Sequence, residues 1–374
     1  QIEGQGIGDV SAFLDTLASE LKDGTYRPLP VRRVTIPKSG GGERNLGVPA
    51  VRDRVAQAAA KLLLEPIFEA DFLDCSFGFR PGRSAHQALE VIREEVNRGR
   101  VWVVDADIAS FFDSIRPDVL RAALEERISD RRILEMLMGW LRSGVWTGTA
   151  LIHPESGTPQ GGVISPLMAN AVLHRLDRTW HEHHRRLGFL VRYADDLVIL
   201  CPTKERAEQA LATLAQILAE LGLSLAKAKT LLVDLRVPKA GFDFLGFHHR
   251  RVESFTHKGR YFCARWPSER AVRRAKERIR SHTDRRWLMR PVGDVVERLN
   301  LFLLGWRGYF AFGNSTTVFH DLDEFVAERV ARFITKKHRH HGRNYGLRVL
   351  IDHEYLGLVR LVGSVRHGPV HAVR

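Results

Sequence analysis

The alternation of apolar and polar residues predicts short strands, some of which end in acidic residues. Apolar β-forming residues occupy 189–191 and 197–200, and Tyr193-Ala194-Asp195-Asp196 lies between them. This pattern predicts two strands joined by a tight turn, with both acids at the tip of the hairpin. An earlier apolar run, 101–108, also carries an acid near its end, at Asp107. We therefore expect carboxylates from two strand ends to lie together at one edge of a sheet.

Apolar residues at helical spacing predict helices between these strands. Residues 54–68 have this spacing, and Val55, Ala59, Leu62 and Leu63 are expected to form the apolar face of the helix. Further helices are expected near residues 13–21, 117–127, 133–141 and 207–222. Short strands are expected at 34–36 and 46–48, across a Gly40-Gly41-Gly42 turn, and at 231–233.

The pattern changes after residue 247. A strand-like run at 260–264 leads to Ser268, which is a good N-cap for a helix reaching about Thr283. That helix has only a narrow apolar seam and is otherwise mostly basic. Two more helices are expected at 295–303 and 322–334. These elements predict a small helical domain with one basic face.

The net charge indicates a polyanionic partner. The chain has 57 Lys and Arg against 44 Asp and Glu, a formal charge of +13. Residues 250–286 hold 13 Lys or Arg and 4 acids, and residues 332–348 hold six Lys or Arg, three His and no acid. Such runs are often solvated surface. Here the surplus of one sign in two blocks favours contact with nucleic acid.

The paired acids have a chemical interpretation of their own. Adjacent carboxylates repel one another, so they need a compensating cation or full solvation. A lone Asp-Asp pair in a turn is usually a solvated loop. Carboxylates that converge from two strand ends instead offer the hard oxygen ligands that Mg²⁺ prefers, together with substrate phosphates. This arrangement suits two-metal phosphoryl transfer on nucleic acid.

The sequence around the acids resembles the reverse transcriptases encoded by group II introns, of the bacterial type without an endonuclease domain. Motifs in the family's order occur at 33–38, 46–49, 52–55, 64–69, 77–84, 107–113, 157–166, 193–196, 229–230 and 242–247. Later segments, 299–300, 305–306 and 309–310, resemble the maturase or thumb region. The resemblance covers nearly the whole chain.

The resemblance implies an α+β right-hand polymerase fold, followed by an all-helical thumb or maturase domain. Fingers are expected at 1–99, with a truncated N-terminal extension. The palm is expected at 100–249, with an antiparallel sheet, the Tyr193–Asp196 hairpin and inserted fingers helices at about 117–155. The thumb is expected at 250–374.

The resemblance also assigns the catalytic residues. It implies that Asp107, Asp195 and Asp196 hold two Mg²⁺ ions, and that Lys229 protonates or neutralises the leaving pyrophosphate. Asp105 lies on the same strand face as Asp107 only if the strand is regular, and we interpret it as structural. Every metal ligand expected from the family is present.

Other family positions imply contacts with the incoming deoxynucleotide. Lys38 and Arg44 would clamp its triphosphate, although Asn45 stands where the family commonly has Pro. Gln160 would lie against the nascent base pair. Phe112 would exclude a 2′-hydroxyl, whereas we assign Phe111 to the core. Ala109 replaces a basic residue that is common in the family.

The remaining implied contacts are with primer and template. Arg80 and Arg83 would follow the template phosphates, and Phe244, Leu245 and Gly246 would form the primer grip. Basic residues of the helix after Ser268 would contact nucleic acid, namely Arg270, Arg273, Arg274, Arg278 and Arg280.

These expectations describe an RNA-directed DNA polymerase with Mg²⁺ as cofactor. Its expected partners are an RNA template (group II intron RNA), a DNA primer or target, and deoxynucleotides. It would act as a maturase in splicing and retrohoming of a mobile element, in the bacterial cytoplasm at the nucleoid. One alternative is a domesticated relative in DNA repair or antiphage defence. Another is an RNA-binding splicing factor without polymerase activity, against which the intact acids argue.

Two further classes are disfavoured by the sequence. The longest charge-free run, 156–174, is interrupted by prolines and glycines and does not predict a membrane span. Cys75, Cys201 and Cys263 lack paired spacing, so the sequence supports neither a disulfide framework nor a zinc knuckle.

Overall fold

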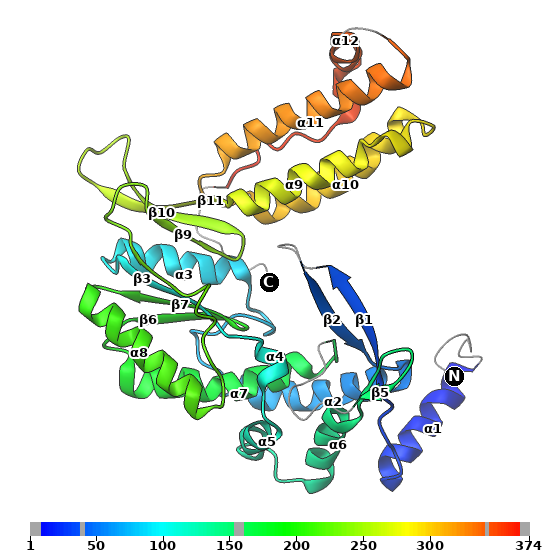
Figure 1. The fold of residues 1–374 in the computed structure, drawn as a ribbon, viewed down its shortest axis with the longest axis vertical. Helices are drawn as coiled ribbons and strands as arrows, with labels where there is room; N and C mark the ends of the chain where they lie inside the picture. Colours follow the sequence, from blue (N-terminus) through cyan, green and yellow to red (C-terminus); the bar gives the residue numbers. More distant parts are fainter. Residues whose placement is uncertain (1–8, 38–41, 153–160, 341–343, 367–374) are drawn as a thin grey trace. The chain divides into compact units, whose positions relative to one another are not determined.

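The computed structural model describes residues 9–37, 42–152, 161–340 and 344–366 (Figure 1). The chain forms two compact units, one of residues 1–88 and 102–232, the other of residues 89–101 and 233–374. Helix α3 (Ala85–Asn97) begins in the first unit and continues into the second. Among the residues described, no helix is both long and apolar enough to cross a membrane.

A four-stranded sheet forms the centre of the first unit. Its strand order is β6-β7-β3-β8, with β3 at Trp102–Asp107, β6 at Phe189–Tyr193, β7 at Asp196–Cys201 and β8 at Leu231–Asp234. Strand β7 pairs antiparallel with both β6 and β3. We call residues 189–201 the acidic hairpin. The predicted strands, their tight turn and the position of both acids at its tip are confirmed.

Helices cover this sheet and bury its apolar side chains. They include α7 (Ser165–Thr179), its π-helical continuation η1 (Trp180–His184) and α8 (Lys204–Glu220). The short helix α4 (Phe111–Ser114) follows β3. Leu173, Leu197, Ile199 and Leu214 are fully buried in the shared core. Burial on both faces explains why β7 is an unbroken apolar run rather than an alternating one.

A second sheet of the first unit has the order β2-β1-β4-β5. Its strands are β1 (Val31–Pro37), β2 (Glu43–Val48), β4 (Val145–Trp146) and β5 (Leu151–Ile152). The predicted antiparallel pairing of β1 with β2 is confirmed. The first unit also contains α1 (Val10–Asp23), α2 (Val51–Glu69), α5 (Pro117–Glu125) and α6 (Arg131–Arg142), and α5 packs against α7 and α6. The Gly40-Gly41 part of the predicted turn lies outside the described residues.

The predicted apolar face of α2 is wrong for three of its four residues, since only Val55 packs against the core. Leu62 and Leu63 are 75% and 71% exposed, and Ala59 is also exposed, whereas Ala56, Ala60, Leu64 and Phe68 are buried. Helix α2 is apolar on two faces, so periodicity alone did not identify the side that packs. The buried face is the one that also carries Asp53 and Gln57.

The second unit combines a small sheet with helices. The sheet order is β11-β10-β9, with β9 at Gly241–Phe244, β10 at Phe247–Glu253 and β11 at Tyr261–Pro267. The helices are α9 (Glu269–His282), α10 (Val292–Phe310), α11 (Thr316–Lys337) and α12 (Tyr345–Asp352), with 3-10 turns η2 (Arg285–Trp287) and η3 (Glu354–Gly357). The Ser268 side chain accepts a bond from the Ala271 amide, so the predicted cap is confirmed.

Candidate active site

The register of the sheet brings the predicted acids together. Asp107, the last residue of β3, pairs directly opposite Asp196, the first residue of β7. Asp196 also pairs with Tyr193 across the hairpin, which leaves Ala194 and Asp195 as the turn. Strand β3 pairs with β7 residue by residue, so it is regular, and Asp105 lies on the same strand face as Asp107. The structural role expected for Asp105 stays a prediction.

Lys229 approaches this cluster from a segment of coil. The Ala226 amide donates to the Asp107 carbonyl at 2.8 Å, and the Ala109 amide donates to the Ser224 carbonyl at 2.8 Å. These bonds fix the coil beside the end of β3. As a result, the Lys229 ammonium forms an ion pair with the Asp107 carboxylate. The structure therefore brings together four side chains that the sequence singled out separately.

The electrostatics of the cluster favour bound positive charge. The Asp196 side chain reaches solvent, yet the protein packed around its carboxyl removes much of its hydration. This loss, followed by repulsion from Asp195 and then Asp107, raises the pKa of Asp196 to about 6, while Lys229 acts in the opposite direction. A cation beside the acids would relieve this repulsion.

A buried arginine supports the turn from below. Arg192, in β6, has no solvent exposure, and its guanidinium forms a bidentate ion pair with Asp177 of α7, which is also fully buried. Its Nη1 donates to the Asn170 Oδ1 at 2.9 Å and to the Ala194 carbonyl at 3.1 Å. Ala194 has φ of 57°, a conformation that costs an L-residue about 1 kcal/mol. Arg192 thus stabilises the strained backbone of Ala194, which sets the direction of the Asp195 and Asp196 side chains.

Gly78 completes this support. The Asn170 Nδ2 donates to the Gly78 carbonyl at 2.9 Å. A Cβ on Gly78 would lie 2.3 Å from the Ala194 nitrogen, so only glycine permits this backbone contact. The Phe77 amide and the Arg192 carbonyl are also bonded, at 2.9 Å. Sequence reasoning missed Arg192, Asp177 and Asn170; the one signal available was an arginine inside an otherwise apolar strand.

A divalent cation fits the acidic hairpin by its donor chemistry. Within the described residues, no group of three or more His, Cys, Asp or Glu side chains is arranged to hold a metal ion by itself. Mg²⁺, however, typically takes one or two carboxylates and completes its shell with water and substrate phosphates. Asp107, Asp195 and Asp196 provide that type of partial, open set.

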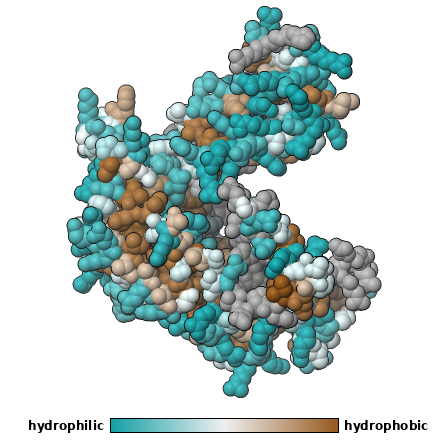
Figure 2. Space-filling model, viewed as in Figure 1, coloured by the Kyte–Doolittle hydropathy of each residue, from teal (hydrophilic) through white to brown (hydrophobic). Residues whose placement is uncertain are grey.

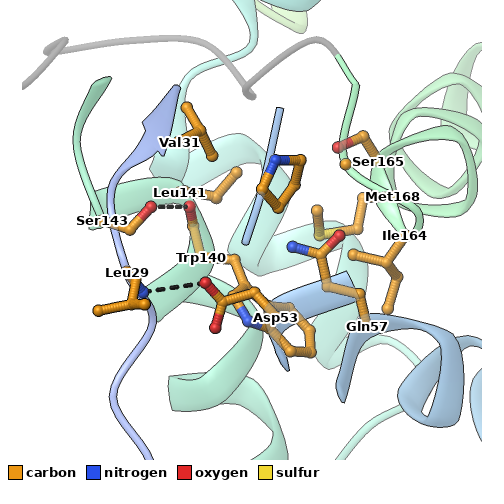
Figure 3. A pocket seen from close by; sticks show the side chains of 12 residues that line it. Leu29, Val31, Asp53, Gln57, Trp140, Leu141, Ser143, Ile164, Ser165 and Met168 are labelled. Carbon is orange, nitrogen blue, oxygen red and sulfur yellow. Dashed lines mark hydrogen bonds between the residues drawn. The ribbon is translucent and has the colours of Figure 1, made fainter. Parts of the chain in front are cut away.

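We call residues 157–166 the glycine-rich segment, and its described part, 161–166, is anchored to α2 and β2. The Gln57 Oε1 accepts the Val163 amide at 2.7 Å, and Gln57 lines a small pocket together with Asp53, Ser165 and Met168 (Figure 3). Gly161 has φ of 118°, and a Cβ there would lie 2.6 Å from the Gly47 carbonyl. Gln57 is thus a further positioning residue that the sequence did not reveal.

Asp53 stabilises the same pocket. Its carboxylate accepts the Tyr26 hydroxyl at 2.5 Å. It also accepts the Leu29 amide at 3.1 Å (Figure 3). The Trp140 indole donates to the Tyr26 oxygen at 2.9 Å. Burial is the main cause that raises the pKa of Asp53, and it outweighs the opposing effect of these bonds. The network joins α2, α6 and the strand that begins at Val31.

Several predicted nucleotide contacts lie outside the described residues. These are Lys38, Gln160 and the side chain of Arg44, whose backbone pairs with Ile36 in the β1–β2 hairpin. Phe112 is half-buried against the core, with its ring edge-on to that of Phe111 at 5.2 Å. Phe111 is 3% exposed, so its assignment to the core is confirmed.

Two predicted nucleic-acid contacts are corrected by burial. The Arg80 guanidinium is buried, bonds Glu69 in a bidentate pair and donates to the carbonyls of Phe72, Leu73 and Ser76. It has no capacity left for a phosphate and instead holds its own loop together. The Phe244 ring is 3% exposed, so the ring packs inside the second unit and is not available for a side-chain contact with a primer.

The other predicted contacts are accessible. Arg83 is half-buried and forms an ion pair with Asp74. Leu245 and Gly246 form a turn in which both residues have positive φ, and the Leu245 carbonyl accepts the Tyr309 hydroxyl at 2.8 Å. The basic residues of α9 predicted to contact nucleic acid are all exposed, namely Arg270, Arg273, Arg274, Arg278 and Arg280. The region of Figure 2 that carries α9 to α12 is mostly hydrophilic.

Comparison with known proteins places this architecture in a family. Residues 36–249 match the family described as reverse transcriptase (RNA-dependent DNA polymerase), and residues 272–349 match the group II intron, maturase-specific domain. The chain belongs to the reverse transcriptase family and carries a group II intron maturase-specific domain. Its α+β fold is of the right-hand polymerase class, followed by helices from Glu269 onward.

The chain matches less than half the length of the two relatives described here. Protein YkfC of Escherichia coli (strain K12) is 43% identical over 176 residues, which cover 46% of this chain and 46% of YkfC. The group II intron-encoded protein LtrA of Lactococcus lactis subsp. cremoris is 41% identical over 163 residues, 43% of this chain and 27% of LtrA. A solved structure of telomerase from Candida albicans aligns with a TM-score of 0.49 and 13% identity, covering 94% of this chain and 68% of that chain.

Proposed function

We propose that this protein is an RNA-directed DNA polymerase, which adds deoxynucleotides to the 3′-hydroxyl of a primer. The observation that carries the proposal is the acidic hairpin. Asp107, Asp195 and Asp196 meet at one sheet edge, with Lys229 paired to Asp107 and Arg192 fixing the turn beneath. This cluster lies within the matched reverse transcriptase segment.

The carboxylates would hold two Mg²⁺ ions, which supply charge neutralisation at the transferred phosphate when bound. The residues of the chain set the geometry. Asp107 at the end of β3 and Asp196 at the start of β7 lie opposite one another at one sheet edge, so they would hold the ions together against the transferred phosphate. The Lys229 ammonium lies at the edge of the cluster, where it would neutralise or protonate the leaving pyrophosphate.

The incoming nucleotide would lie between the β1–β2 hairpin and the glycine-rich segment. Lys38 and Arg44 would bind its phosphates and Gln160 would contact the new base pair. Gln57 and Gly161 support this proposal, because they tie the start of that segment to α2 and β2. Phe112 would then exclude ribonucleotides, Arg83 would contact the template, and Leu245 and Gly246 would position the primer.

A second role, in splicing, is favoured by the match of residues 272–349 to a maturase-specific domain. We propose that the protein binds the RNA of a group II intron and assists its splicing and retrohoming. The five exposed arginines of α9 would contribute phosphate contacts. Since YkfC and LtrA are bacterial proteins, we place this activity in the bacterial cytoplasm, at the nucleoid.

The division into fingers (1–99), palm (100–249) and thumb (250–374) also stays a proposal. The structure divides into two units only. The first contains the acidic hairpin and also the β2-β1-β4-β5 sheet, so it spans the expected fingers and palm.

Primer extension by the purified protein tests the polymerase role. A DNA primer on an RNA template should be extended with deoxynucleotides and Mg²⁺, and extension should stop when a chelator removes the cation. The RNA that co-purifies with the protein should contain group II intron sequence. Failure to extend any primer, with intact RNA binding, would favour a splicing factor without polymerase activity. Extension without bound intron RNA would favour a domesticated relative in repair or defence.

A further inference from the structure

A basic cavity in the second unit lies apart from the residues discussed so far. It is lined by η2 and α11, has a volume of about 180 Å³, and includes Arg285, Arg329, Arg332 and Lys336. Arg329, Arg332 and Lys336 recur three and four residues apart on α11, so they share one face of that helix. Arg285, Arg332 and Lys336 belong to the two basic blocks of the sequence, but the individual residues predicted to contact nucleic acid in this unit's basic helix all lie on α9.

One wall of the cavity is rigid. The Arg329 Nε donates to the Thr283 Oγ1 at 3.1 Å, and Thr283 is buried. The Lys337 ammonium donates to the Leu288 carbonyl at 2.8 Å, which ties the loop after η2 to α11. Asp284 caps η2 by accepting the Arg286 amide. These hydrogen bonds connect the segment 283–288 to α11 and so define the walls of the cavity.

The charges around the cavity are only partly balanced. Arg332 is paired with Glu328, and the Asp284 carboxylate also lines the cavity. Within the described part of the chain, neither Arg285 nor Lys336 has an acidic partner. Burial, together with repulsion from Arg332 and Arg280, lowers the pKa of Arg329. A bound anion would relieve this repulsion.

We propose that this cavity binds a phosphate group of RNA. The cations that converge on it suit the tetrahedral oxygens of a phosphate, and arginine supplies several donors in one plane. The positive charge continues beyond the cavity at Arg286 and Arg290, and the Met289 side chain between them is 93% exposed. This continuity favours a polymer over a free anion. The choice of RNA rests on the proposed function, since the cavity lies within the maturase-specific match.

If the proposal is right, Arg285 and Lys336 contact the same phosphate, and this can be tested. Arg285→Gln, Lys336→Gln and the double variant are compared for binding to a labelled single-stranded RNA over a range of salt concentrations. Each single change should weaken binding about tenfold. Because both side chains contact the same phosphate, the double variant should flatten the slope of log K against log salt by no more than about 0.7. Both residues are exposed, so the thermal stability should not change.

A matched control removes two charges outside both basic blocks of the sequence. Arg131→Gln combined with Arg132→Gln changes two exposed residues at the start of α6 and should weaken RNA binding much less. An equal loss in this control, or a slope change of about 1.4 in the double cavity variant, would overturn the proposal. Binding of RNAs with and without a 5′-phosphate shows which phosphate the cavity takes. Equal affinity indicates a phosphate within the RNA chain, and tighter binding of the 5′-phosphorylated RNA indicates the terminal phosphate. Loss of primer extension with normal RNA binding in the double cavity variant would overturn the proposal, because the change would then act on catalysis and not on RNA.

Discussion

At the scale of single residues, the acidic hairpin depends on a side chain that has no access to substrate. Arg192 bonds Asp177, Asn170 and the carbonyl of Ala194, so the position of the acids is set by a buried ion pair. Buried pairs are often weak contributors to stability, but removing one partner leaves the other charge without compensation. Here the pair also fixes a strained turn, which gives it a role in geometry as well as in folding.

Arg192→Lys should slow primer extension more than it weakens primer–template binding. Lysine keeps the charge but cannot form the bidentate pair with Asp177 and also reach the Ala194 carbonyl. We expect kcat to fall about tenfold or more, with KM for the primer–template nearly unchanged, and stability to fall by about 3 kcal/mol. Steady-state kinetics and urea unfolding measure both effects. Arg186→Lys, at an exposed position, is the control; a fall in stability with unchanged kcat would reduce Arg192 to a structural role.

Phe112→Ala should admit ribonucleotides while deoxynucleotide incorporation changes little. Loss of the ring would leave room for a 2′-hydroxyl at the position that the family places under the sugar. Competition between the two nucleotide types in primer extension measures this discrimination. Phe111→Leu, in the adjacent core position, should lower stability without changing the choice of sugar. Discrimination that persists in Phe112→Ala would assign Phe112 to the core as well.

At the scale of elements, α2 shows how packing decides between two similar faces. Three consecutive leucines, Leu62, Leu63 and Leu64, have exposed fractions of 75%, 71% and 4%. Of the three leucines only Leu64 is in the core, and its face of the helix also presents Gln57 to the glycine-rich segment. The helix therefore links the packing of the first unit to the proposed nucleotide site.

The three leucines provide their own matched set. Leu64→Ala should lower the free energy of unfolding by about 2–5 kcal/mol, because it leaves a cavity in the core. Leu62→Ala and Leu63→Ala remove the same atoms from exposed positions and should each change it by less than about 0.5 kcal/mol. Urea unfolding measures all three. Equal losses at the three positions would contradict the buried face assigned to α2.

At the scale of the whole molecule, the second unit contains a pH-sensitive residue. His249 is fully buried, and its ring stacks on Phe242 at 5.0 Å. Burial, with smaller effects from Arg265 and His248, lowers the pKa of His249 from 6.5 to about 3. Between these two pH values the unfolded chain binds a proton that the folded chain does not. The stability from this residue is thus complete above pH 6.5 and is lost as the pH falls toward 3.

Acidification from pH 7 to pH 5 should therefore destabilise the second unit. The expected loss from His249 is about 2 kcal/mol, at roughly 1.4 kcal/mol per pH unit below 6.5. Unfolding of the full chain at both pH values measures it, and His249→Phe should remove most of this dependence. His257→Phe, at an exposed position, should leave it unchanged. The same pH dependence in wild type and His249→Phe would show that other groups cause it.

Local patterns in the sequence predicted much of this molecule. The acidic hairpin, the β1–β2 pairing and the α9 cap follow from alternation, turn residues and capping chemistry, which act within a few residues. The role of Arg192 was not predictable in this way, because its partners come from α7 and from a separate loop. Arg80 was misassigned for a related reason, since a motif identifies a residue but not whether its guanidinium is buried.

We infer that the acidic hairpin, together with Asp107, is the catalytic centre of an RNA-directed DNA polymerase. The most direct measurement is primer extension and RNA binding by the same preparation of Asp195→Ala. Loss of this carboxylate should abolish extension, because it removes several kcal/mol or so of transition-state stabilisation. RNA binding should stay nearly unchanged, because the variant is more positive than the wild type. Extension at the wild-type rate in Asp195→Ala would contradict the account.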